Sequence, residues 1–133
     1  MMRILLVEDE YLVATSLKFV LEMMGYDVVG VADDVASAVT EAERTRPNLA
    51  FVDIQLAQGD SGLDAAAELQ KRGVICIFVT GNPPSEPRPD LALGCLPKPF
   101  SDVGLAGAIK IAEAFIEGSP LPKPPPELEL YRH

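Results

Sequence analysis

Short, continuous apolar runs alternate along the chain with longer segments in which apolar residues recur every three or four positions. The continuous runs are Ile4–Val7, Val28–Val31, Leu49–Val52, Val74–Val79 and the brief Cys95–Leu96. Strands that are apolar on both faces are typical of a parallel sheet that is covered on each side. The order therefore predicts an α/β domain, in which helices joined by right-handed crossovers cover both faces of a five-stranded parallel sheet.

The segments with helical spacing are bounded by residues that start or stop helices. They run from Tyr11 to Met24, from Val35 to Arg46, from Leu63 to Lys71, and from a cap at Ser101 to about Ile116. Gly25 suits the left-handed position that follows a helix, and Pro47 cannot continue one. Asp33 or Asp34 can cap the second helix through its carboxylate.

Two segments interrupt this alternation because they are rich in proline. Between Val79 and Cys95, four prolines leave about one turn, Asp90 to Leu93, able to coil, so the helix expected there is short or absent. The segment 118–133 contains five prolines, which favour extended geometry without a packed core. We therefore divide the chain into a domain, residues 1–117, and a Pro-rich C-terminal tail, residues 118–133.

Composition narrows the class of protein. A chain of 133 residues with 48% hydrophobic residues fits one domain, and 11 basic against 20 acidic residues give a net charge of −9. Nucleic acid and anionic membranes would repel such a chain.

The first apolar run is too short for a signal peptide or a membrane span, so we expect a cytoplasmic protein. Cys76, Cys95 and His133 have no zinc-site spacing, and both cysteines suit buried apolar positions.

Polar residues gather where the predicted strands end. Glu8 and Asp9 follow the first strand, Asp53 the third, Thr80 ends the fourth, and Lys98 follows the fifth. Each has an ordinary structural explanation when it is taken alone: a helix cap, a turn residue or a solvated loop charge. In an open parallel sheet, however, these ends meet at the edge where ligands bind, so we expect the residues to form one site.

The residue types at this edge indicate phosphoryl chemistry. Carboxylates on neighbouring strands repel one another unless a cation lies among them, and oxygen ligands without histidine or thiol suit Mg²⁺. Asp53 follows an apolar strand and can attack phosphorus as a nucleophile. Lys98 and Thr80 can then stabilise the phosphoryl oxygens as charge spreads over them.

These motifs together resemble the receiver domain of two-component response regulators. The matching pieces are VEDE with Glu8 and Asp9, FVDIQL with Asp53, FVTGN with Thr80 and LPKPF with Lys98, and the resemblance covers about residues 2–117. It implies a flavodoxin-like, doubly wound sheet with strand order 2-1-3-4-5. It also implies a Mg²⁺ site formed by Asp9, Asp53 and the backbone carbonyl of Gln55, with Glu8 acting largely through water, and a cis peptide bond before Pro99.

The function implied by the resemblance is that of a phosphoacceptor rather than an enzyme. Asp53 would accept a phosphoryl group from the phosphohistidine of a sensor histidine kinase or phosphotransfer protein, and Thr80 and Lys98 would respond to it. Slow autodephosphorylation would follow. Since no output domain is recognised, we expect the protein to act as a single-domain regulator, by docking on an unknown downstream protein or by phosphorelay.

Two further features qualify the resemblance. The FVTGN motif is similar to a subgroup whose fourth strand reads Phe-Ala-Thr-Gly and which is partnered with HWE or HisKA2 kinases. Cys95 stands where the family usually has an aromatic switch residue, and a thiol is too small to carry that motion. We therefore expect the signal to pass through the loop from Gly81 to Leu93.

Three alternative functions are compatible with an α/β fold of this kind. A flavin or nucleotide site would need a Gly-rich turn after the first strand, where three acids stand instead. An aspartyl-phosphate hydrolase usually has a second acid two residues after its nucleophile, where this chain has Gln55. A pseudo-receiver that binds partners without phosphorylation remains the alternative, although Asp53, Thr80 and Lys98 are all present.

Overall fold

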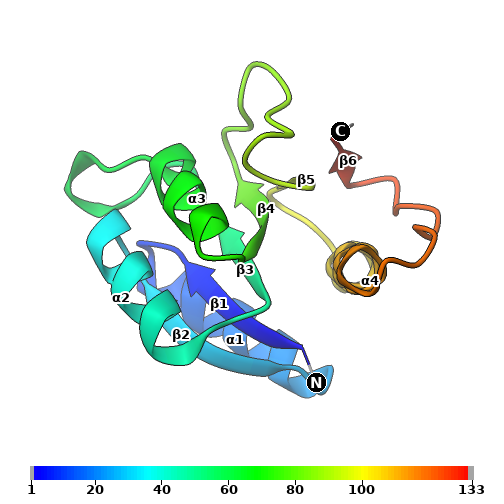
Figure 1. Cartoon of the computed structure of the whole chain (residues 1–133), viewed down its shortest axis with the longest axis horizontal. Coiled ribbons are helices and arrows are strands. Elements are labelled where there is room, and N and C mark those ends of the chain that lie inside the picture. The colour runs from blue at the N-terminus through cyan, green and yellow to red at the C-terminus, as the bar shows by residue number, and fades with distance from the viewer. Residues whose placement is uncertain (1, 132–133) are drawn as a thin grey trace.

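A parallel sheet forms the centre of the molecule in a computed structural model that describes residues 2–131. The parallel strands are β1 (Arg3–Val7), β2 (Asp27–Ala32), β3 (Leu49–Val52), β4 (Ile75–Thr80) and β5 (Gly94–Pro97). Their order is β2-β1-β3-β4-β5, and a short antiparallel strand, β6 (Glu129–Leu130), extends the sheet beside β5. The flavodoxin-like α/β fold and the predicted order of the first five strands are confirmed (Figure 1).

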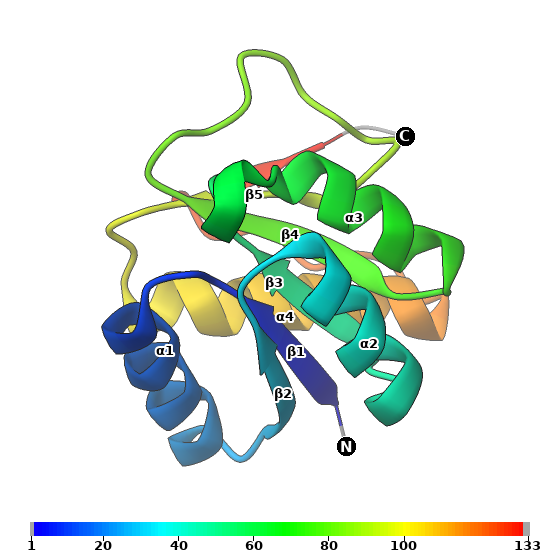
Figure 2. The same cartoon turned by 90° about the vertical axis from the view of Figure 1, so that its left-hand side faces the viewer.

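Helices cover both faces of the sheet, as the apolar strands require. The helices are α1 (Tyr11–Met23), α2 (Val35–Thr45), α3 (Gly62–Lys71) and α4 (Asp102–Glu117), with a single 3-10 turn, η1 (Ala57–Gly59). The buried residues of α2 and α3 form one apolar core with the sheet, and those of α1 and α4 form a second core on the other face (Figure 2). No helix in the described part of the chain is long and apolar enough to cross a membrane.

The local signals at the helix ends are satisfied in the structure. Asp34, rather than Asp33, caps α2, because its carboxylate accepts a hydrogen bond from the Ser37 N–H at 2.7 Å. The Ser101 hydroxyl caps α4 by accepting from the Gly104 N–H at 3.0 Å. Gly25 takes the left-handed conformation after α1, with φ of 92°. Strand and helix boundaries therefore follow directly from the sequence pattern.

The expected weak helix between β4 and β5 is absent. Residues 81–93 form a loop, and its single turn is held by the Leu91 and Ala92 N–H groups, which both donate to the Arg88 carbonyl. Leu91 and Leu93 are buried, whereas most of residues 81–87 are exposed. The prolines thus remove the helix but leave the end of the loop anchored to the core.

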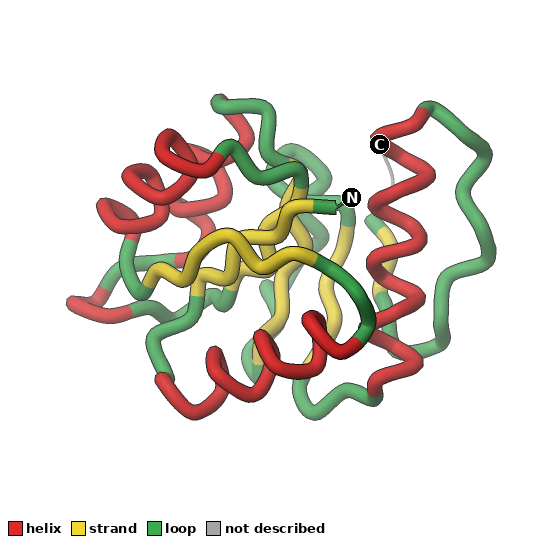
Figure 3. The backbone as a smooth tube through the Cα atoms, turned by 90° about the horizontal axis from the view of Figure 1, so that it is seen from below, coloured by secondary structure: helices red, strands yellow, loops and turns green. Residues whose placement is uncertain are grey.

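The expectation that the tail lacks packed contacts is wrong for its described part, residues 118–131. After α4 the chain turns back along that helix and adds β6 to the edge of β5 (Figure 3). Leu128 and Tyr131 are buried, the first in the core beside α4 and the second in the core beside α3. Composition predicted an extended segment, but alternate apolar residues after its last proline give it a strand that packs. Met1, Arg132 and His133 lie outside the described residues.

Candidate functional site

Three charged side chains from different parts of the chain meet at the carboxyl edge of the sheet. Glu8 follows β1, Asp53 follows β3 and Lys98 follows β5. The Lys98 ammonium donates to Glu8 Oε1 at 2.6 Å and to Asp53 Oδ2 at 3.0 Å. Because both carboxylates are buried, they depend on this single ammonium for charge compensation.

Burial and pairing act in opposite directions on the ionisation of these groups. Burial raises the pKa of Glu8, although its hydrogen bond with Lys98 partly offsets the effect. Burial alone would lower the pKa of Lys98, but the hydrogen bonds to Glu8 and Asp53 outweigh it and raise that pKa. The ammonium is therefore held charged, beside a carboxyl group that is costly to ionise.

The backbone around Asp53 fixes the position of its carboxylate. Its N–H donates to the Val7 carbonyl at 2.9 Å, which ties the residue to β1. Oδ1 accepts from the Ile54 N–H at 2.7 Å, while Oδ2 faces Lys98. The Gly62 N–H donates to the Ile54 carbonyl at 2.6 Å and holds the following loop against the start of α3. Asp53 is thus held between two strands and a helix.

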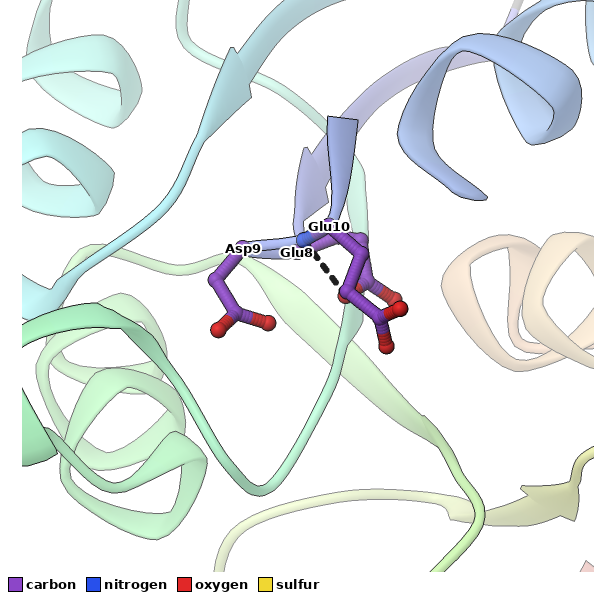
Figure 4. Close-up of side chains that lie close together, drawn as sticks. All are labelled: Glu8, Asp9 and Glu10. Atoms are coloured by element: carbon purple, nitrogen blue, oxygen red, sulfur yellow. Dashed lines mark hydrogen bonds between the residues drawn. The ribbon is translucent and has the colours of Figure 1, made fainter. Parts of the chain in front are cut away.

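Three consecutive acids form the other side of the site. Glu8, Asp9 and Glu10 each present one carboxylate oxygen within 4.8 Å of the others (Figure 4). The Glu10 N–H donates to Glu8 Oε2 at 3.1 Å, and both Asp9 and Glu10 are exposed. Asp9 has no hydrogen-bond partner among residues 2–131. The sequence interpretation did not include Glu10 in the metal site, although the run of three acids was a signal for it.

This donor set suits a magnesium ion. All of its side-chain ligand atoms are carboxylate oxygens, which Mg²⁺ prefers, and the two exposed acids leave room for water ligands. The unpaired Asp9 carboxylate is available to a cation without the loss of a protein contact. The residues present therefore fit the ion.

Two predicted site residues, Thr80 and Gln55, make no side-chain hydrogen bond to this cluster among residues 2–131, although the Lys98 N–H donates to the Thr80 carbonyl at 2.9 Å. Thr80 ends β4 and is buried, and its hydroxyl accepts from the Asn82 N–H at 3.0 Å. Gln55 pairs with Ser61 in an isolated bridge. Within residues 2–131, no hydrogen bond joins Asp53 to Thr80 or Gln55. The Lys98–Pro99 peptide bond is cis, as the resemblance implied.

The arrangement can hold a cation and an anion side by side. Asp9 and Glu10 offer oxygens to a cation, while Lys98 and the N–H groups of the surrounding loops can face an anion. Asp53 lies between these two regions as a positioned carboxylate. Such a site can bring a magnesium-bound phosphoryl group onto a carboxylate oxygen.

Comparison with known proteins agrees with this geometry. The family model of the response regulator receiver domain matches residues 4–110. The phyllosphere-induced regulator PhyR of Methylorubrum extorquens is 41% identical over 117 residues, which is 84% of this chain and 43% of that protein. The response regulator PhyR from Brucella abortus superimposes with a TM-score of 0.77 at 32% identity, covering 88% of this chain and 49% of that one.

A second similar structure contains the expected metal. The receiver domain of sensor histidine kinase PA1611 from Pseudomonas aeruginosa has a magnesium ion coordinated in its active site cleft. It has a TM-score of 0.71 and 29% identity, covering 82% of this chain and 94% of that one. The present chain spans about half the length of the curated relatives it matches.

Proposed function

The chain belongs to the response regulator receiver family, and from this premise we propose that it accepts a phosphoryl group on Asp53 from the phosphohistidine of a histidine kinase or phosphotransfer protein. The carrying observation is the placement of Asp53, whose Oδ2 lies 3.0 Å from the Lys98 ammonium at the carboxyl edge of the sheet. A buried carboxylate beside one ammonium and a cluster of acids is suited to phosphoryl transfer rather than to folding stability alone.

In the proposed reaction, an Asp53 carboxylate oxygen attacks phosphorus. The bond from phosphorus to the histidine nitrogen breaks, its electron pair returns to the imidazole, and the imidazole takes up a proton from solvent. No base is needed, because the nucleophile is already an anion. Lys98 moves its hydrogen bonds to a phosphoryl oxygen, and the Thr80 hydroxyl donates to another.

Magnesium is the proposed cofactor of this transfer. When bound, Mg²⁺ neutralises the negative charge that the phosphoryl group brings to the acidic site. Asp9, Asp53 and the backbone carbonyl of Gln55 would hold it, and Glu8 would act largely through water. Autodephosphorylation would follow when a water molecule attacks the same phosphorus and the bond to the Asp53 oxygen breaks, which regenerates the carboxylate, releases inorganic phosphate and gives the water's proton to solvent.

The surface beside Lys98 supports docking of a kinase helix. A groove of about 620 Å³ lies between α1 and the loop that follows Lys98, and Leu12 and Phe100 are among its lining residues. Tyr11, Leu12 and Val103 are large apolar side chains that are more than three-quarters exposed around this region. Apolar surface of this kind is typical of protein interaction sites.

A cytoplasmic location belongs to this proposal, because histidine kinases use ATP.

Intact-mass measurement tests the proposed function. After incubation with Mg²⁺ and phosphoramidate, whose P–N bond resembles that of phosphohistidine, the protein should gain one phosphoryl group. Asp53→Asn should lose the adduct, because an amide oxygen is a poor nucleophile, and chelation of Mg²⁺ should suppress it.

Asp64→Asn is the matched control, since Asp64 is an acid in the first turn of α3, and this variant should still gain the group. An adduct that persists in Asp53→Asn would contradict the assignment of the acceptor. A folded protein that gains no group from phosphoramidate or from acetyl phosphate would instead favour the pseudo-receiver, which binds partners without phosphorylation.

A further inference from the structure

The edge of the sheet beside β5 is occupied by the chain's own residues 119–131, which we call the strap. Gly94 pairs with Leu130 and Cys95 pairs with Glu129 in an antiparallel arrangement. The Tyr131 N–H donates to the Leu93 carbonyl at 2.8 Å, which extends the pairing. The strap therefore satisfies backbone groups that a parallel sheet would otherwise leave open at its last strand.

The strap also binds the first turn of α4 through a carboxylate. Glu127 accepts from the Ser101 N–H at 2.7 Å and from the Ser101 hydroxyl at 2.5 Å. These hydrogen bonds lower the pKa of Glu127. Anions are favoured at this position, because the first N–H groups of a helix have no partners within the helix.

Three glycines make room for the strap. A Cβ atom at Gly94 would lie 2.3 Å from the Glu129 carbonyl oxygen, and one at Gly107 would lie 2.7 Å from the Pro125 ring. A Cβ atom at Gly104 would lie 2.5 Å from a Glu127 carboxylate oxygen. Two of these glycines lie within α4, where each costs roughly 1 kcal/mol relative to alanine. The surface beneath the strap is thus shaped to receive a polypeptide segment at some cost to the helix.

Specific pockets hold the end of the strap. Leu128 packs into the core beside α4. The Tyr131 ring is buried in the opposite core, which also contains Cys95. The Cys95 side chain is completely covered, and its burial raises the pKa of the thiol to about 11. An extended segment is thus recognised through an acidic residue, alternating apolar residues and an aromatic ring.

The strand pairing that closes this surface is short. The strand β6 has two residues, and residues 119–123 are exposed. Short edge pairings of this kind open at a small fraction of the cost of global unfolding. When the strap lifts, the β5 edge and the adjoining face of α4 become available to another extended chain.

We propose that the β5 edge and the adjoining face of α4 form a docking site for an extended acidic peptide, and that the strap occupies this site reversibly within its own molecule. A partner binds by adding a strand to β5 in place of the strap. Its segment carries the pattern Glu-Leu-x-Leu-Tyr, in which the acid binds Ser101 at the start of α4 and the last ring fills the pocket beside Cys95. This inference is independent of phosphorylation at Asp53.

A fluorescent synthetic peptide of residues 119–131, SPLPKPPPELELY, tests the proposal in the full chain. It should bind weakly to the wild type, whose site is occupied. In the double variant Glu127→Ala, Tyr131→Ala, the strap is weakened while the site is unchanged, and affinity should rise at least about tenfold, because the open fraction sets the apparent Kd. Leu121→Ala is the control, since Leu121 is an exposed strap residue, and it should behave as the wild type does.

Two further measurements separate the site from general loosening of the fold. Adding Gly107→Ala to the double variant should weaken peptide binding at least about tenfold, since a Cβ atom fills the site, although alanine favours the helix. Alkylation of Cys95 should accelerate in the double variant, while alkylation of Cys76, which is buried beneath α3 and the loop, should not.

Equal peptide affinity for the wild type and the double variant, or no effect of Gly107→Ala, would overturn the proposal. Accelerated labelling of both cysteines would also overturn it, because the whole fold would then be loosened. Light scattering of the wild type should show a monomer. A dimer that is lost in the double variant would mean that a second copy supplies the strap, and would refute occupancy within one molecule.

Discussion

At the scale of single residues, Lys98 is the centre of the site, because one ammonium compensates two buried carboxylates. The distances of 2.6 Å to Glu8 and 3.0 Å to Asp53 leave neither acid with another cation in the described part of the chain. An incoming phosphoryl group changes this balance directly. The same ammonium that stabilises the resting site is the group that must change partners on phosphorylation.

Replacement of Lys98 by alanine should separate metal binding from signalling. Without the ammonium, Glu8 and Asp53 repel each other, and the metal-free protein should lose about 2 kcal/mol of stability. Stabilisation by Mg²⁺ should be equal to or larger than in the wild type, while the response to the phosphoryl mimic beryllium fluoride should disappear. Thermal melting measures the stability with and without Mg²⁺, and amide exchange measures the response to beryllium fluoride. Lys110→Ala, which removes an exposed ammonium from α4, controls for the loss of charge.

A normal response of Lys98→Ala to beryllium fluoride would show that the ammonium does not report the phosphoryl state. Loss of Mg²⁺ stabilisation in this variant would show instead that Lys98 organises the acids for metal binding. Either result would contradict the prediction that Lys98 responds to the phosphoryl group without being needed for Mg²⁺ binding.

At the scale of elements, the sequence predicted the helices and parallel strands well, because their signals are local. Apolar runs, helical spacing and capping residues such as Asp34 and Ser101 are read over a few neighbouring positions. The same holds for the site residues at strand ends, since parallel strands bring their carboxyl ends together. Glu8, Asp53 and Lys98 were therefore expected to meet, and they do.

The strand β6 could not be predicted in this way. Two residues have no periodicity, and their pairing depends on the shape of a surface far away in the chain. Gly104 and Gly107 lie in a helical pattern that gives no sign of a contact with the end of the chain. Their meaning becomes clear when Glu127 and Pro125 are seen to occupy the space that side chains would fill. Proline content correctly indicated extended geometry but carried no information about what the extended chain contacts.

The loop of residues 81–93 should become more protected when the site is phosphorylated. Thr80 precedes this loop, and its hydroxyl accepts from the Asn82 N–H. When that hydroxyl turns to donate to a phosphoryl oxygen, the position of the first loop residues should change with it. With Mg²⁺ and beryllium fluoride, amide exchange across residues 81–90, which are largely exposed, should slow several-fold. Asp53→Asn should show no change under the same conditions.

Protection confined to α1 and α4 would contradict this prediction. Cys95→Ala provides a second check, since the prediction assigns the response to the loop and not to the thiol. This variant should retain most of the change.

At the scale of the whole molecule, acidic charge is concentrated where the metal is proposed to bind. The chain carries a net charge of −9, and three consecutive acids lie together beside two strands that end in the same place. A bound cation would reduce the repulsion among these acids, and it would do so only in the folded state, where the site is formed. Metal binding and global stability are therefore linked.

Millimolar Mg²⁺ should raise the melting temperature of the wild type. Binding of one ion adds about 1.4 kcal/mol to the free energy of unfolding at ten times Kd. Asp9→Ala should remove most of this increase, because it deletes a carboxylate that has no other partner in the described structure. Asp27→Ala is the control, since Asp27 is an exposed acid at the start of β2, and it should retain the increase. An Asp9→Ala variant with the full wild-type increase would contradict the assignment of this ligand.

The docked strap competes with any partner for the β5 edge, and the tether favours the strap. Because residues 118–126 tether β6 to the end of α4, the strap meets its own site at an effective concentration on the order of 1 mM, the scale for a short linker. A free segment of equal intrinsic affinity, present at about 1 μM, faces a thousandfold disadvantage, which corresponds to about 4.1 kcal/mol. A partner must therefore gain that amount from contacts outside the strap's footprint, or from a change that weakens the tethered segment. The tether thereby sets the threshold concentration at which this regulator can engage a partner on the β5 edge.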